Sequence, residues 1–348
     1  MSAVLGAVLA DPSPPVSADQ ARDLAQELFG VVGAAVALPG ERDRNFRIEE
    51  PDGPQWVLKV VHPAEARGLT QMQGKVLLHL AEQDPELPVP RVRLTTGTGA
   101  LQTIWHEAGQ PEGRTVRMYS YLPGVPLLGR SSPALRASIG GFLGRLDNAL
   151  DGFAHPHESH DLIWDAHKLG QIGDRLAAEA GPGAVKPRLL HFREHCEPAL
   201  ARLRAQVIHN DMNPHNVLTS ASDREDITGV IDFGDVIRAP VVQDVATAAS
   251  YQVLGYGDPL DGPADVVRAY HAACPLRPED LAVLFDLMMA RLLLRDTIAH
   301  VRARNTPADR DYILRNSAQA KTALERLAGT TCESAQQRFR EEIGGPGR

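Results

Sequence analysis

Residues 209–216 read HNDMNPHN and residues 231–235 read IDFGD, and these two motifs decide the expected fold. Short apolar runs at 207–208 and 217–218 flank the first motif, which predicts a strand, a loop and a second strand. The second motif continues an apolar run that begins at Gly229. Each motif is therefore expected to present polar side chains at the end of a buried strand.

Asp211, Asn216 and Asp232 are the residue types that phosphoryl transfer needs. The reaction requires a carboxylate near the acceptor hydroxyl, and oxygen ligands that hold Mg²⁺ against the nucleotide phosphates. Asp211 suits the first role, as catalytic base. Asn216 can return its amide oxygen to the same place, and Asp232 can add a charged ligand, so we expect these two to bind magnesium.

An ordinary loop also explains the first motif, because Asp and Asn are common turn residues and HxDxxxxN alone is a weak signal. The second motif strengthens the functional interpretation, since Asp-Phe-Gly follows in the order of the protein-kinase signature. Upstream, Lys59 stands inside the apolar run WVLKV (56–60), as does the kinase lysine that contacts the phosphates. A lysine at a strand edge is the simpler interpretation of Lys59 alone. Its position ahead of both motifs favours the phosphate role.

Residues 40–46 read GERDRNF and stand where a loop over the phosphates is expected, although they hold one glycine and no GxGxxG. The backbone N–H groups and the Asn45 amide can face the phosphates, with Arg42 or Arg44 nearby. A plain surface turn explains the stretch equally well.

Composition narrows the class of protein. The 348 residues are enough for two domains, and 43% of them are hydrophobic. The net charge of −8 and the pI near 5.9 argue against a nucleic-acid partner. The three cysteines lack the spacing of a zinc knuckle or a disulfide framework, which predicts a reducing, cytoplasmic location. No apolar run approaches the roughly 18–20 residues that cross a bilayer, so no membrane partner is expected.

Local patterns predict a sheet-rich first lobe and a mainly helical second lobe. Helices are expected from the N-cap Ser17 to Phe29 and from Pro63 to about Glu82. Strands are expected around residues 46–48, 56–61, 92, 101–105 and 116–121. The expected organisation is a loose leader (1–17), a nucleotide-binding lobe (18–122), a catalytic and substrate-binding lobe (123–332) and a disordered tail (333–348).

Histidines form two groups that suggest metal binding only weakly. His155, His157 and His160 lie beside a proline without a second cluster of ligands, so a polar loop is expected. His191 and His195 are four residues apart, and we expect an ordinary helix face.

In combination, the motifs resemble the aminoglycoside phosphotransferase superfamily, and most closely its hydroxylysine kinase branch, over about residues 18–330. The resemblance is carried by GERDRNF (40–46), VLKV (57–60), YLPG (121–124), Trp164-Asp165, HNDMNPHN, IDFGD and PVVQDVA (240–246). It implies an α+β, bilobal, protein-kinase-like fold with a small β-rich N-lobe and a larger, mainly helical C-lobe.

The resemblance also implies roles for individual residues. Asp211 is then the catalytic base, Asn216 and Asp232 bind Mg²⁺, and Lys59 binds the phosphates of ATP or GTP. The hinge that holds the adenine or guanine would comprise Met118, Tyr119, Ser120, Tyr121 and Leu122. Asp244 would brace the catalytic loop. Gln73 stands where many relatives have the Glu that pairs with the lysine, so the charged pair is in question here, although the Gln73 amide is still able to hydrogen-bond Lys59.

The acceptor follows only from the branch, which implies 5-hydroxylysine. Acidic groups for ammonium ions and a donor for the carboxylate are then expected, and Asp165, Asp235 and Arg238 are the candidates by position. Homoserine, choline and aminoglycosides remain alternatives because the superfamily includes kinases for all of them.

Two other classes of protein fit less well. A protein kinase is excluded because Asp244 follows Asp232 closely, without a long activation segment or an Ala-Pro-Glu motif. A non-catalytic, nucleotide-binding pseudokinase is disfavoured because Lys59, Asp211, Asn216 and Asp232 are all present.

Overall fold

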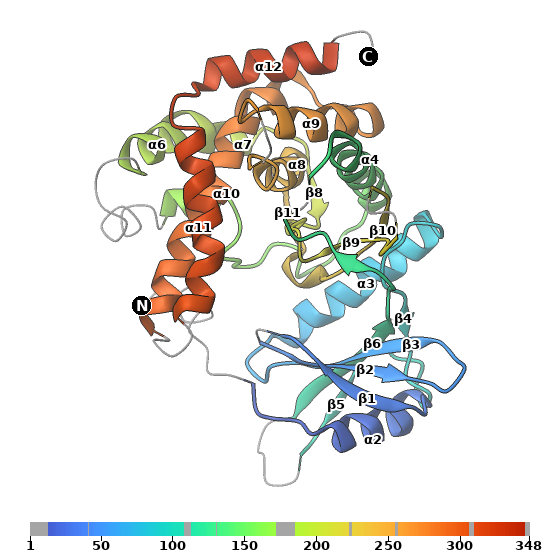
Figure 1. Ribbon diagram of the computed structural model, residues 1–348. Helices are drawn as coiled ribbons and strands as arrows, with labels where there is room; N and C mark the ends of the chain where they lie inside the picture. Colours follow the sequence, from blue (N-terminus) through green and yellow to red (C-terminus); the bar gives the residue numbers. More distant parts are fainter. Residues whose placement is uncertain are drawn as a thin grey trace.

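The computed structural model describes residues 13–344 except 41, 108–112, 130, 172–184, 223–224, 255–256 and 306–309. Figure 1 shows a small part built on a sheet and a larger, mainly helical part. The predicted bilobal, kinase-like α+β fold is confirmed. Among the described residues, no helix has both the length and the apolar character needed to cross a membrane.

The small lobe is an antiparallel sheet with one helix packed on it. In the sheet the strands run in the order β1-β2-β3-β6-β4, and β5 also pairs with β6. Its elements are α2 (Ala18–Phe29), β1 (Ala34–Leu38), β2 (Arg44–Glu49), β3 (Gln55–Val60), β4 (Val92–Arg93), β5 (Thr103–Trp105) and β6 (Arg114–Ser120). Buried side chains of α2, β2, β3 and β6 form one core under this sheet.

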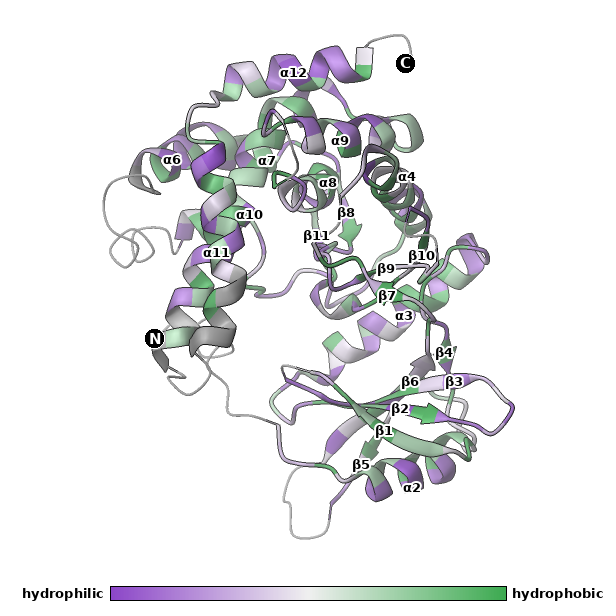
Figure 2. Ribbon diagram, in the orientation of Figure 1, coloured by the Kyte–Doolittle hydropathy of each residue, from purple (hydrophilic) through white to green (hydrophobic). Residues whose placement is uncertain are grey.

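Helix α2 begins and ends as its sequence predicts. The Ser17 hydroxyl accepts from the Gln20 backbone N–H, and the Gln20 side chain accepts from the Ser17 N–H, which makes a capping box. Gly30 ends the helix with a φ of 66°, a conformation that glycine adopts without strain. Hydrophilic and hydrophobic residues alternate along α2 in Figure 2, and the apolar face packs on the sheet.

Helix α3 (Arg67–Gln83) lies between the lobes. Its buried Met72, Val76, Leu77 and Leu80 belong to the large-lobe core, although the chain leaves the small lobe only after β6. Any movement of α3 is therefore coupled to the large lobe.

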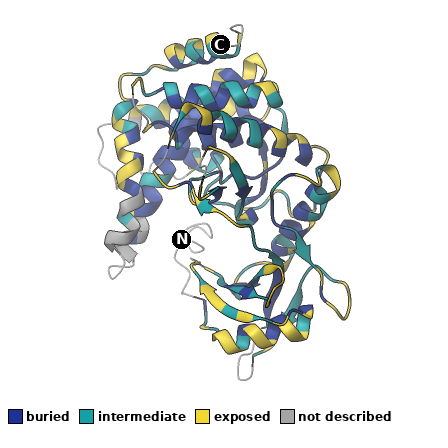
Figure 3. Ribbon diagram, turned by 45° about the vertical axis from the view of Figure 1, so that its right-hand side comes forward, coloured by how far each residue is buried: buried dark blue, intermediate teal, exposed yellow. Residues whose placement is uncertain are grey.

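The large lobe is helical around two short sheets. Strands β7, β9 and β10 form one sheet, and β8 pairs with β11 in the other. Its elements are β7 (Val125–Pro126), α4 (Pro133–Leu150), α6 (Val185–His191), the π-helical turn η1 (Phe192–Cys196), α7 (Glu197–Leu200), β8 (Ala205–Ile208), β9 (Val217–Thr219), β10 (Ile227–Val230), the 3₁₀ turn η2 (Phe233–Asp235), β11 (Ile237–Pro240), α8 (Val241–Ser250), α9 (Asp261–Ala273), α10 (Pro278–Asn305), α11 (Arg310–Arg326) and α12 (Cys332–Gly344). Buried residues concentrate in the middle of this lobe in Figure 3, where every residue of α8 is buried.

The predicted disordered tail is wrong for residues 333–344, which form most of α12. The many charged residues of this segment suggest disorder, but Ala335 and Phe339 are four residues apart and lie on one face of the helix. Both are fully buried. Arg338 also pairs with Asp261 at 3.1 Å. Residues 345–348 lie outside the described residues.

The predicted leader is also ordered at its end. Residues 1–12 lie outside the described residues, but Ser13 is buried and its hydroxyl accepts from Arg114 at 2.8 Å. At least residues 13–17 are therefore part of the small lobe.

Replacing Phe339 with Ala should lower the free energy of unfolding by about 3 kcal/mol, because it removes a fully buried ring and leaves a cavity. Urea denaturation of the whole chain measures the change. Arg340→Ala, at an exposed neighbour, is the control and should change stability by less than about 0.5 kcal/mol. An equal, small effect of both substitutions would show that α12 does not contribute to the core.

Candidate active site

The loop of residues 209–216 is held in place by Asp244 of α8. The two carboxylate oxygens accept from the backbone N–H groups of His209 and Asn210, each at 2.8 Å. Asn210 has a φ of 64°, and Gln243 donates to its side-chain oxygen at 2.9 Å. The expected bracing role of Asp244 is confirmed, and this fully buried carboxylate fixes where Asp211 lies.

Asp211 has different neighbours at its two carboxylate oxygens. Oδ2 accepts from the side-chain amides of Asn213 and Asn216, each at 2.7 Å. Oδ1 accepts from Arg291 of α10 at 2.5 Å. Asn216 donates both bonds to Asp211 through Nδ2, which leaves its Oδ1 available as a ligand.

Asp232 follows β10 in a left-handed conformation with a φ of 63°. Its Oδ1 accepts from the Gly234 N–H at 3.1 Å and lies 3.9 Å from Lys59 Nζ. The positive charge of Lys59 lowers the pKa of this half-exposed carboxyl group, so it is ionised at neutral pH. Asn216 and Asp232 thus offer one neutral and one charged oxygen ligand, the donor set that a hard divalent cation such as Mg²⁺ prefers.

His209 joins the two motifs. Its Nε2 lies 3.2 Å from the Ile231 carbonyl, and its Nδ1 accepts from the Asp211 N–H at 3.2 Å. Its ring also meets Phe233 edge-on, with centroids 4.8 Å apart. This pairing fits a neutral imidazole that donates through Nε2, and it connects the loop of Asp211 to the turn of Asp232.

Lys59 lies in the middle of the small-lobe sheet, opposite Asn45 of β2 and Arg117 of β6. Its Nζ lies 3.4 Å from Asp43 Oδ2, and both side chains are mostly buried. Asp43 was missed by the sequence interpretation, although it lies inside GERDRNF beside the residues that were chosen. The carboxylate that accompanies Lys59 thus comes from the loop before β2 and not from α3.

Gln73 does not make the hydrogen bond to Lys59 that the sequence allows. Its Nε2 donates to the Gly234 carbonyl at 3.1 Å, and its Oε1 accepts from Arg117. A glutamine satisfies both partners because it offers a donor and an acceptor, whereas a glutamate would place a second acceptor against the carbonyl. Gln73 therefore ties α3 to the turn after Asp232.

Arg44 does not face the expected phosphate site. Its guanidinium donates to the Ser13 carbonyl at 2.5 Å, since successive residues of a strand point to opposite faces and Asn45 takes the face of Lys59. Arg42 pairs with Glu65 at 3.1 Å. Asn45 donates to the Pro39 carbonyl at 3.3 Å, while its Oδ1 is buried without a hydrogen-bond partner among the described residues.

Asp43→Asn should raise the nucleotide KM about tenfold, because Lys59 loses its nearer carboxylate and the order that this carboxylate imposes. The asparagine oxygen can still accept from the His62 N–H, so the loop should keep its shape. Initial rates over a nucleotide titration measure the change. Glu65→Gln, which removes only the pair with Arg42, is the control, and an unchanged nucleotide KM in Asp43→Asn would contradict a role for Asp43.

The residues of the expected hinge form the end of β6 (Met118 to Ser120) and the two positions after it (Tyr121 and Leu122). Met118 is fully buried in the small-lobe core, and Ser120 exchanges backbone and side-chain bonds with Arg91. The Tyr121 N–H donates to the Gln55 carbonyl at 2.9 Å. A side chain at Gly229 would meet Leu122 at 2.8 Å, so the segment packs tightly against β10. Contact of Tyr119 or its neighbours with a nucleotide base stays a prediction.

Arg291 and Arg295 were also missed. They lie four residues apart in α10, and a signal was present, since both interrupt the apolar stretch LMMARLLLRD (287–296). Arg291 is 5% exposed and lies over the Trp164 ring, 4.9 Å from its centroid. Burial opposes its charge, but Tyr251 and Asp211 keep its pKa above the ordinary value. Arg291 Nε and Nη1 are buried without hydrogen-bond partners among the described residues.

Arg295 lies over the ring of Tyr251, 4.2 Å from its centroid, on the same helix face as Arg291. With described residues it makes no hydrogen bond or ion pair. Burial lowers its pKa, and the nearby Asp211 opposes that shift. Arg291 and Arg295 thus place two guanidinium groups on one face of α10, and Arg291 contacts Oδ1 of Asp211.

The three expected substrate residues have different surroundings. Asp235 lies close enough to raise the pKa of Arg291. Asp165 accepts from the His167 N–H at 3.2 Å, next to Trp164. Arg238 instead pairs with Glu158 at 3.5 Å, which makes it a weaker candidate for the carboxylate of a substrate than Arg291.

Asp147 of α4 is buried beside Asp244, and its Oδ2 accepts from the Tyr270 hydroxyl at 2.5 Å. Burial, and then the charge of Asp244, raise the pKa of Asp147 well above its usual value. The folded state consequently binds a proton that the unfolded state releases near pH 4, so stability falls as the pH rises toward the folded pKa.

Asp147→Asn should remove that pH dependence, because the amide cannot ionise while its oxygen still accepts from Tyr270. Wild-type protein should therefore lose more stability between pH 5 and pH 8 than the variant. Urea denaturation at several pH values measures both slopes. If the free energy of unfolding of the two proteins changes equally with pH, Asp147 does not bind an extra proton beside Asp244 in the folded state.

The sequence matches a known protein family and is similar to named proteins over most of its length. The model of the phosphotransferase enzyme family (APH) matches residues 34–282. Hydroxylysine kinase of Mus musculus is 26% identical over 343 residues, which cover 91% of this chain and 90% of that protein. Hydroxylysine kinase of Danio rerio is 24% identical, over 91% of this chain and 93% of that protein.

Solved structures share the fold at low sequence identity. A microcompartment-associated aminopropanol kinase superposes with a TM-score of 0.69 at 18% identity, over 91% of this chain and all of that one. Amicoumacin kinase, solved with AMP-PNP and Ca²⁺, superposes with a TM-score of 0.66 at 15% identity, over 94% and 96% of the two chains.

Proposed function

The chain belongs to the phosphotransferase enzyme family and is a small-molecule kinase, and from this premise we propose that its acceptor is a hydroxylated amino acid, with 5-hydroxylysine as the first candidate. A nucleoside triphosphate and a divalent metal ion are its co-reactants. We propose Mg²⁺ as the metal and ATP or GTP as the phosphoryl donor.

In this proposal Asp211 accepts the proton of the acceptor hydroxyl as that oxygen attacks the terminal phosphorus, and the bond from this phosphorus to the bridging oxygen breaks, which releases the nucleoside diphosphate. Asn216 and Asp232 hold Mg²⁺, which neutralises charge on the phosphate oxygens when it is bound. Lys59, kept in place by Asp43, contacts the phosphates. Residues 119–122 contact the nucleotide base, whereas Met118 is fully buried in the small-lobe core and is no longer a candidate. We also propose a reducing, cytoplasmic location, which fits the absence of disulfide bonds at all three cysteines.

The observation that carries the choice of acceptor is the pair of unsatisfied donors on Arg291. Leaving charged donors buried without partners is costly, and a bound carboxylate would satisfy them. Arg291 donates to Asp211 Oδ1, whereas Asn216 donates to Oδ2, so the guanidinium and the proposed metal ligand bond different oxygens of the proposed base. An acceptor with only amines would bring more positive charge to this place.

Hydroxylysine and homoserine both carry the carboxylate, and choline and aminoglycosides do not. Hydroxylysine also has a second ammonium group, for which Asp165 and Asp235 are the nearby acidic partners by position. The relatives named hydroxylysine kinase favour the same choice.

The test is an acceptor panel with purified protein, Mg²⁺ and either ATP or GTP. It compares kcat/KM for 5-hydroxylysine, homoserine, choline and an aminoglycoside. The highest value is expected for 5-hydroxylysine. Preference for choline or an aminoglycoside would overturn the amino-acid assignment, and nucleotide binding without turnover on any acceptor would favour a pseudokinase.

A further inference from the structure

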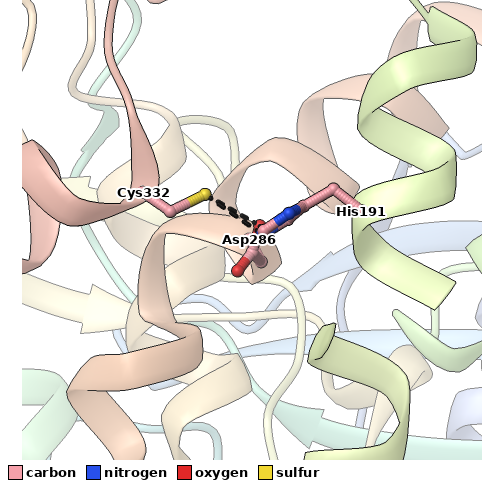
Figure 4. Close-up of side chains that lie close together, drawn as sticks. All are labelled: His191, Asp286 and Cys332. Atoms are coloured by element: carbon pink, nitrogen blue, oxygen red, sulfur yellow. Dashed lines mark hydrogen bonds and ion pairs between the residues drawn. The ribbon is translucent and has the colours of Figure 1, made fainter. Parts of the chain in front are cut away.

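A second cluster of ligand-type side chains lies among the helices of the large lobe. His191 ends α6, Asp286 lies in α10 and Cys332 begins α12. Figure 4 shows the three side chains converging. His191 Nε2 lies 3.3 Å from both Asp286 Oδ1 and Cys332 Sγ, and Sγ lies 3.4 Å from Oδ1.

We propose that His191, Asp286 and Cys332 bind a Zn²⁺ ion. In a tetrahedral zinc site with bonds of about 2.3 Å to sulfur and about 2.0–2.1 Å to nitrogen and oxygen, neighbouring ligand atoms lie roughly 3.3–3.6 Å apart. The three distances between the side-chain atoms agree with these edges to about 0.2–0.3 Å. The ligand atoms are therefore spaced for zinc without any rearrangement of the helices.

Charge and accessibility fit the same ion. A thiolate and a carboxylate together balance the two charges of Zn²⁺, and the neutral imidazole is the third ligand. The Asp286 side chain is 9% exposed, but His191 is 35% exposed, so the fourth position can take a water molecule. His195 lies one turn on, with its ring centroid 4.6 Å from that of His191, and is the nearest imidazole that could replace this water.

Burial raises the pKa of both Asp286 and Cys332, and the positive charge of Arg188 opposes part of that rise. Its guanidinium donates to the Thr330 carbonyl at 3.1 Å and lies over the Phe285 ring. It is therefore held by other groups and does not pair with the cluster.

The ligand types separate this site from the proposed magnesium site. Thiolate and imidazole select zinc over magnesium, which prefers carboxylate and carbonyl oxygen. The ligands also come from three segments far apart in the sequence, so a bound ion ties α6 and α12 to α10. The expected consequence is a more stable large lobe. From the sequence, His191 and His195 were expected to form an ordinary helix face. The fold brings Asp286 and Cys332 beside His191, and these two partners are far from it in the sequence.

Cobalt is the probe, because Co²⁺ replaces Zn²⁺ and absorbs light. The full chain, first freed of metal by a chelator, should bind one equivalent of Co²⁺ with a thiolate-to-metal charge-transfer band and the intense visible bands of tetrahedral cobalt. Zn²⁺ should abolish both bands, and millimolar Mg²⁺ should not. Cys332→Ser should lose the charge-transfer band, and His191→Gln should weaken binding at least tenfold.

Cys274→Ser is the matched control, because this buried thiol bonds Arg204 elsewhere in the lobe, and its cobalt spectrum should equal that of the wild type. Free Zn²⁺ at a hundredfold above Kd should also raise the Tm of the wild type by about 3–5 °C, and that of Cys332→Ser by much less. An unchanged charge-transfer band in Cys332→Ser, or no cobalt bands in the wild type, would overturn the proposal. The spectrum does not depend on kinase activity, so it tests this site alone.

Discussion

Asp211→Asn should lower kcat about 10³-fold while the nucleotide still binds, because an amide cannot accept the proton of the attacking hydroxyl. The surrounding geometry favours a clean test. Asp244 holds the start of the loop through the backbone of His209 and Asn210, and these bonds do not involve the Asp211 side chain. Steady-state kinetics gives kcat, and calorimetric titration with a non-hydrolysable nucleotide gives Kd.

Asn213→Ala is the matched control. It removes one of the amide donors to Asp211 Oδ2 but leaves the carboxylate, so its loss in kcat should be much smaller. Because Asp211→Asn also leaves Arg291 without its anion, urea denaturation should accompany the kinetics. A folded Asp211→Asn variant with wild-type kcat would refute Asp211 as the base.

The sequence was informative wherever the function depends on neighbours along the chain. HNDMNPHN brings Asp211 and Asn216 together within one loop, and the strand before Asp232 sets the second motif. The alternation of β2 and β3 likewise places Lys59 and Asn45 opposite each other. These are local rules of strands and turns, which a single sequence carries.

Contacts between distant segments were not predictable in the same way. Arg291 reaches Asp211 only because α10 packs against α8 beside the catalytic loop. Gln73 was expected beside Lys59 by analogy with relatives. In the structure Arg117 donates to Gln73, and Asp43 pairs with Lys59, so each of the two residues has another partner. The tail was misjudged because its charged residues outnumber the two apolar ones that dock α12.

The small lobe pairs its mostly buried lysine differently from protein kinases. In protein kinases a glutamate of the corresponding helix pairs with the strand lysine. Here Lys59 pairs with Asp43, and α3 is linked through Gln73 to Arg117 and to Gly234. Since Gly234 lies two residues after Asp232, α3 still contacts the turn that carries Asp232, but through a neutral hydrogen bond to the Gly234 carbonyl.

We propose that Arg295, which lies on the same face of α10 as Arg291, also binds the carboxylate of the acceptor. Arg295→Gln should then lower kcat/KM for 5-hydroxylysine by roughly 10²–10³-fold, because the carboxylate loses a guanidinium partner in a largely buried place. Arg295 is preferable to Arg291 for this test, because it makes no hydrogen bond to Asp211. Its substitution also leaves the stack of Arg291 on Trp164 intact. The glutamine can still pack along Tyr251.

The decisive comparison uses a second acceptor, the decarboxylated analogue of 5-hydroxylysine, which has the same hydroxyl and side-chain amine. Wild-type protein should favour the amino acid strongly, and Arg295→Gln should lose most of that preference while its rate with the analogue barely changes. A structural defect would instead lower both rates together. If Arg295→Gln keeps the full preference for the amino acid, the carboxylate binds elsewhere, and Arg238 becomes the next candidate, since only a surface pair with Glu158 occupies it.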